Sequence, residues 1–99
     1  MSDLSSRNGT TQAVAYTGTA AASNAFGTQS RQIRIVANSA CHYSIGTSPT
    51  ATVTDAFLPA SWVEYRSVTP GQKISAIQAA TGGLVTGTAG SLWVTELTD

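Results

Sequence analysis

Glycine and proline residues recur about every ten residues along most of this chain, and that spacing limits what it can fold into. They stand at Gly18, Gly27, Gly46, Pro49, Pro59, Pro70-Gly71, Gly82-Gly83, Gly87 and Gly90. The segments between them are short and rich in β-branched and aromatic residues, a pattern typical of small antiparallel sandwiches and barrels. We therefore predict an all-β fold without helices, either a small antiparallel β-sandwich or a jelly-roll-like barrel.

Alternation of apolar and polar residues identifies the strongest strands. In the segment 31–37, Ile33 and Ile35 alternate with Gln32 and Arg34, as expected for a half-buried strand. Further strands are predicted at 40–45, 62–68, 73–77 and 91–97, with weaker candidates at 11–16 and 84–88. The positions that share the apolar face of these strands predict a core that contains Ile33, Ile35, Tyr43, Ile45, Val63, Tyr65, Ile74 and Val94.

Two turns are predicted between these strands. Asn38-Ser39 separates the strands 31–37 and 40–45, and asparagine tolerates a positive φ, so we expect these strands to form a hairpin. Thr69-Pro70-Gly71-Gln72 has proline and glycine at the two central positions, as a type II turn requires.

The first twelve residues show no hydrophobic periodicity. We predict a flexible arm over Met1–Gln12, followed by a single domain over residues 13–99. One leucine, Leu4, and the charged pair Asp3 and Arg7 bury too little apolar surface to offset about 1–2 kcal/mol of backbone entropy per residue. Leu4 and Arg7 are therefore candidate contacts with a partner, in an arm that becomes ordered on an adjoining subunit; a frayed terminus without a role is the alternative.

Charged residues are scarce. They make up 10% of the chain, with five Lys and Arg against five Asp and Glu, where about 25% is usual. Nucleic acids and anionic membranes are bound by clustered Lys and Arg, so neither is an expected partner. The polar surface must consist largely of the 27 Ser and Thr residues. Such a surface favours a subunit packed against others, and we expect a homo-oligomer, with a trimer favoured.

Residues able to perform catalysis or hold a metal do not form a recognisable group. Cys41 and His42 are neighbours on a predicted strand and would point to opposite faces, with the thiol buried. Asp55 and Glu64 are a pair of acids of the kind found in almost any chain. We therefore expect no enzyme, no catalytic or metal site and no cofactor. The single cysteine excludes an internal disulfide and fits synthesis in a reducing cytoplasm.

The aromatic residues have three candidate roles: core, subunit contact or ligand platform. Tyr43 and Tyr65 have Ile and Val as same-face neighbours, which favours the core. Trp62 lies on the polar face of its strand beside Glu64, which favours an exposed contact. Leu92, Trp93 and Val94 make their strand apolar on both faces, so either Trp93 or its two neighbours must be covered by something else. Trp62 and Trp93 are therefore candidate interface residues.

Several segments together resemble a small virion protein of tailed bacteriophages. They are Gln32–Ala37, Ala40–Gly46, Phe57–Ala60, Val63–Tyr65, Val68–Ile74 and Leu92–Leu97, within residues 26–97. The resemblance implies a β-sandwich or jelly-roll subunit of the virion, made in the cytoplasm of the bacterial host. It implies a capsid decoration, or cement, protein that binds the major capsid protein or other virion subunits. A tail adaptor, or a receptor- or carbohydrate-binding module of a tail appendage, is the alternative.

Overall fold

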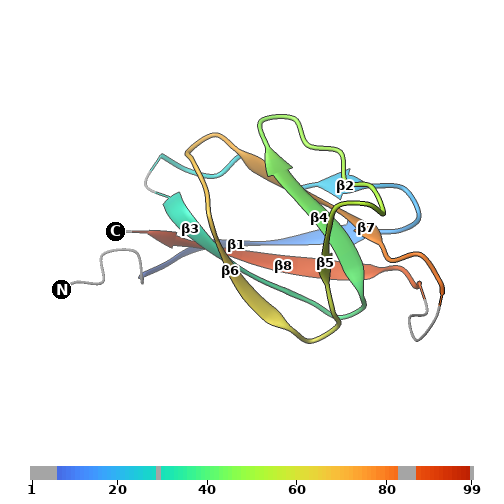
Figure 1. The fold of residues 1–99 in the computed structure, drawn as a ribbon. Helices are drawn as coiled ribbons and strands as arrows, with labels where there is room; N and C mark the ends of the chain where they lie inside the picture. Colours follow the sequence, from blue (N-terminus) through green and yellow to red (C-terminus); the bar gives the residue numbers. More distant parts are fainter. Residues whose placement is uncertain (1–6, 29, 83–86, 99) are drawn as a thin grey trace.

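The computed structural model describes residues 7–28, 30–82 and 87–98 and consists of two antiparallel sheets of four strands each (Figure 1). Sheet A contains, in spatial order, β1 (Arg7–Tyr16), β8 (Gly90–Thr98), β3 (Ser30–Ala37) and β6 (Val63–Ser67). Sheet B contains β2 (Ala21–Ala22), β7 (Lys73–Gln78), β4 (Cys41–Gly46) and β5 (Ala56–Leu58). The described residues include no helix, so the predicted all-β sandwich is confirmed.

The part of the chain that the structure describes holds no helix able to cross a membrane.

Consecutive strands mostly belong to opposite sheets, and this makes the predicted hairpin wrong. β3 lies in sheet A and β4 in sheet B. Both edges of β3 are already occupied, by β8 and β6, so β4 has no edge of β3 to pair with. Asn38 is instead tied to β8: its backbone N–H donates to the carbonyl of Ser91, and its side-chain oxygen accepts from the N–H of Ser91. The chain therefore crosses between the sheets at Asn38-Ser39.

The turn predicted at Pro70-Gly71 is present. Gly71 has a φ of 89°, which the third position of a type II turn requires, and the Gln72 N–H donates to the carbonyl of Thr69 at 3.1 Å. This turn also joins the two sheets, since β6 belongs to sheet A and β7 to sheet B.

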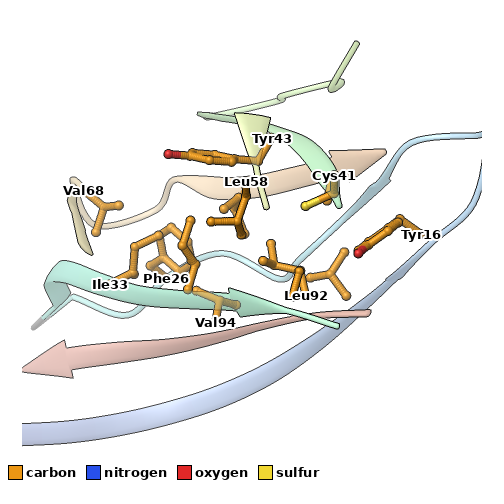
Figure 2. Packing of buried hydrophobic residues seen from close by; sticks show 14 residues of the cluster. Tyr16, Phe26, Ile33, Cys41, Tyr43, Leu58, Val68, Leu92 and Val94 are labelled. Carbon is orange, nitrogen blue, oxygen red and sulfur yellow. The ribbon is translucent and has the colours of Figure 1, made fainter. Parts of the chain in front are cut away.

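The core lies between the sheets and receives side chains from both (Figure 2). Of the predicted core residues, Ile45 is partly buried and packs against the core, and five are buried: Ile33, Ile35, Tyr43, Ile74 and Val94. Figure 2 shows Tyr16 and Cys41 at one end of the core, with Phe26 and Val68 toward the other.

The predicted face of β6 is wrong. Val63 and Tyr65 were expected inside, but both are exposed. The register of β6 on β3 pairs Glu64 with Ile35 and Arg66 with Ile33, so the charged side chains share the inner face of sheet A. β6 is an edge strand, and its inner face reaches the open side of the sandwich, where charged groups stay partly solvated. The alternation of apolar and charged residues alone cannot show which of the two faces of β6 is turned inward.

The arm predicted over Met1–Gln12 is wrong for residues 7–12, which belong to β1 and pair with β8. Pairing with β8 gives hydrogen-bond partners to the backbone groups on one side of this segment, which the sequence argument did not count. Residues 1–6, including Leu4, lie outside the described residues. The weak strand at 84–88 lies partly outside them, and residues 87–89 are not a strand. The short strands β2 and β5 were not predicted.

Gly90 is placed where a side chain does not fit. A Cβ there would meet the side-chain oxygens of Asn38 and Ser39 and come within 3.0 Å of the Tyr16 hydroxyl. Gly90→Ala is expected to lower the free energy of unfolding by about 1–3 kcal/mol, the usual cost of overpacking. Gly46→Ala is the matched control, because no atom lies within 4 Å of its added Cβ. Urea denaturation of both variants checks this, and equal stabilities would contradict it.

Candidate interaction surface

An apolar row crosses the outer face of sheet A from one edge to the other. The register pairs Ala13 with Trp93, Trp93 with Val36, and Val36 with Val63, and residues paired across neighbouring strands share a face. The strands that carry the row lie side by side in Figure 1. We call Ala13, Trp93, Val36 and Val63 the outer apolar row.

The outer apolar row is open to solvent. Trp93 is 40% exposed and Val63 38%, while Leu92 and Val94 on either side of Trp93 are buried in the core. The two-faced strand predicted from the sequence therefore turns its tryptophan outward. Tyr65 follows two residues after Val63 on the same face and is 51% exposed. The charged side chain nearest in register is Arg34, opposite Tyr65. An exposed apolar surface of this kind is a common feature of protein interaction sites.

Trp62 lies directly before β6, the edge strand of sheet A that carries Val63 and Tyr65. Its N–H donates to the carbonyl of Pro59, and that of Ser61, which has a positive φ of 62°, donates to the carbonyl of Ala37. This tight segment leaves the Trp62 indole 58% exposed. The expectation that Trp62 and Trp93 are both available for contacts is consistent with these positions. Of the two other candidates, Leu4 is not described, and Arg7 begins β1 opposite Thr98.

Tyr43, Glu64 and Arg66 form a polar cluster on the inner side of β6, at the open side of the sandwich. The Tyr43 hydroxyl donates to Glu64 Oε1 at 2.9 Å and accepts from Arg66 Nε at 2.7 Å. Arg66 Nη2 also lies 2.8 Å from the same carboxylate oxygen. Desolvation by burial, together with the Glu64 hydrogen bond, raises the pKa of Tyr43, while the hydrogen bond from Arg66 opposes this rise. Each group has a partner, so the cluster is a structural connection between the two sheets.

Glu96 is a buried acid that the sequence analysis missed. It is paired with Ile33 in register and therefore points between the sheets. Its Oε1 accepts hydrogen bonds from the Gly27 N–H at 2.8 Å and from the Ser30 hydroxyl. A single acid in the apolar strand 91–97 was the only available signal. Its role is to hold the loop that leads into β3.

Cys41 and His42 have separate surroundings. The thiol of Cys41 is buried, and burial raises its pKa from 9.0 to about 11, while a hydrogen bond with Tyr16 opposes this rise. His42 is half-buried on the outer face of sheet B, where Nδ1 lies 2.9 Å from the Asp55 carbonyl and the ring packs against Phe57. A thiol so reluctant to ionise is a weak nucleophile.

The two carboxylates that the sequence analysis considered as a pair, Asp55 and Glu64, have separate hydrogen-bond partners. Asp55 accepts hydrogen bonds from the backbone and side chain of Thr52 in the loop before β5, whereas Glu64 belongs to the cluster at β6. Within residues 7–28, 30–82 and 87–98, no three His, Cys, Asp or Glu side chains gather into a metal-binding group. The surface feature that stands out is therefore the outer apolar row with its aromatic neighbours.

Comparison of the chain with protein-family models, with curated proteins and with solved structures gave no match.

Proposed function

We propose that this chain is a decoration subunit of a tailed-bacteriophage head, which binds shell subunits through the outer apolar row and stabilises the shell by surface burial. The exposure of Trp93, Val63 and Tyr65 on one face of sheet A carries the proposal. Exposed Trp and Tyr residues are common anchors of protein interfaces. The low charge of the chain and its resemblance to small virion proteins also support it.

A tail adaptor or carbohydrate-binding module is the second candidate. Trp62 favours it, because among the described residues its side chain is the most exposed of the large apolar ones, at 58%, and presents an aromatic ring to the solvent. The location of the chain on virus particles, produced from the genome that encodes it, distinguishes the two candidates. Gold-labelled antibody against the chain is expected on the heads. Label confined to tails would favour the second candidate, and particles without the chain would contradict both.

The contact itself is tested by restoring particles that lack the chain with purified variants. Trp93→Ala is expected to weaken binding by about 30-fold or more, since truncation of a central aromatic anchor costs about 2 kcal/mol or more. Phe57→Ala is the matched control, because Phe57 is as exposed as Trp93, at 40%, but lies in sheet B. Occupancy is measured by quantitative gel analysis of the sedimented particles. Equal binding of the two variants would exclude the outer apolar row as the contact.

A further inference from the structure

Sheet edges expose N–H and C=O groups that can pair with another strand, and three of the four edges in the described part of the structure are protected. β2 has only two residues and β5 only three, which leaves little edge to pair with. β6 carries Glu64 and Arg66, two charged side chains directed toward the inner face. Short edge strands and inward-pointing charges are the devices by which proteins prevent unwanted strand pairing.

β1, the fourth edge, has little such protection. It spans ten residues, and between Asn8 and Tyr16 it contains no charged residue and no proline. Its bulge lies between Asn8 and Thr11, so the six residues from Thr11 to Tyr16 pair regularly with β8. The other side of β1 has no strand partner among the described residues.

The neighbouring loop that contains Asn24 contacts a side chain of β1 and does not pair with its main chain. Gln12 is paired with the buried Val94 and so points toward the interior. Its side-chain amide bonds the backbone of Asn24, accepting from the N–H at 2.8 Å and donating to the carbonyl at 3.4 Å. The contact is made by the side chain, and the outward backbone groups of β1 are left for another strand.

We propose that two copies of this chain pair antiparallel through their β1 edges, so that the four strands of each A sheet form one continuous sheet. The side chains that point outward from this segment, Thr11, Ala13 and Ala15, are small, uncharged and exposed. A two-fold axis near Ala13 therefore places no like charges opposite each other.

A second copy is the occupant we propose, because the small, uncharged side chains of this segment let two β1 edges approach closely, and the pairing also has a consequence for the outer apolar row. Ala13 is the member of that row on β1, at the pairing edge. Pairing two β1 edges near Ala13 joins both rows into one apolar strip that contains two copies of Trp93. The proposed dimer thus doubles the surface that an external partner would contact, whatever that partner is.

The geometry also determines the size of the assembly. Antiparallel pairing of a strand with its own copy is an isologous contact, which closes with two subunits. This differs from the trimer favoured by the sequence analysis. A six-residue pairing is only about 20 Å long, so the interface belongs to the small class, and we expect a dissociation constant in the micromolar range.

Introducing a charge at Ala13, positive in one variant and negative in another, tests the dimer in the full chain. Ala13→Lys and Ala13→Glu each place like charges across the two-fold axis, and each is expected to raise the dissociation constant at least about tenfold. An equimolar mixture of the two places opposite charges there and is expected to restore dimers. Sedimentation equilibrium at about 10–200 µM measures all three, bracketing the expected constant.

Controls separate pairing from folding. Ser67→Lys puts the same charge at an exposed position of β6, on the opposite edge of sheet A, and is expected to leave the dimer unchanged. Melting temperatures establish that the Ala13 variants fold. If either fails, exchanging Thr11 and Ala15 together, to two Lys in one chain and two Glu in the other, provides the same test, because these exposed residues lie opposite each other about an axis near Ala13. A wild-type monomer or trimer across this concentration range, or a mixture that stays monomeric, would overturn the proposal.

Discussion

Replacing Ile35 with alanine is expected to lower the free energy of unfolding by about 2–5 kcal/mol, the usual cost of deleting a large buried aliphatic side chain. Ile35 is fully buried at the centre of sheet A, paired with Val94 on one side and Glu64 on the other. Its loss leaves a cavity that can close only in part, because β3 is held by β8 on one side and β6 on the other. Urea denaturation followed by circular dichroism measures the change.

Val63→Ala is the control for that variant. Val63 was expected in the core together with Ile35, but it lies on the outer face and is 38% exposed. Its truncation is expected to change the free energy of unfolding by no more than about 0.5 kcal/mol, as is usual at surface positions. A larger loss from Val63→Ala than from Ile35→Ala would mean that the faces of sheet A are assigned the wrong way round.

Alkaline pH is expected to destabilise the fold through its buried thiol and phenols. Burial raises the pKa of Cys41 from 9.0 to about 11, and desolvation also raises the pKa of Tyr16 and of Tyr43. The folded chain therefore keeps these protons to a higher pH than the unfolded chain. The stability that the Cys41 thiol contributes is intact below about pH 9 and is lost as the pH rises through 11, and the two phenols add to this loss at alkaline pH.

The share of Cys41 in this loss is roughly 2–3 kcal/mol, at about 1.4 kcal/mol for each pKa unit. Cys41→Ala removes the titrating group, while its packing cost is nearly independent of pH. The variant is thus expected to lose less stability than the wild type between pH 8.5 and about 11. Denaturation curves across this range measure both proteins. Parallel pH profiles would show that Cys41 does not contribute.

The two proposals assign different parts of sheet A to different contacts. The outer apolar row is a face and provides side chains for an external partner, whereas the free side of β1 is an edge and provides backbone groups for a second copy. Trp93→Ala changes the face and leaves the β1 edge intact, whereas the charge exchange at Ala13, which belongs to both, is used only for its effect on the dimer. We expect Trp93→Ala to form dimers normally but to bind particles about 30-fold more weakly or worse.

The fold class, the type II turn and a central part of the core could be predicted from the sequence. These follow from local chemistry: period-two alternation places Ile33 and Ile35 on one face, and Pro70-Gly71 has the backbone preferences that its turn needs. Trp93 could also be recognised as one member of an apolar strand with two faces. The sequence left open whether it or its neighbours would be exposed.

Which strands pair, and which face of each strand is buried, depends on contacts between segments that are distant in sequence. The strands 31–37 and 40–45 have a plausible hairpin turn between them, yet β3 is flanked by β8 and β6, which are distant in sequence, so β4 belongs to the other sheet. Residues 7–12 have no apolar periodicity, yet they belong to a strand because β8 pairs with one side of their backbone. In β6, the register on β3 turned Glu64 inward and Tyr65 outward. Strand pairing is made by backbone hydrogen bonds between distant segments, which side-chain patterns do not encode, and a shift of one residue exchanges the two faces of a strand.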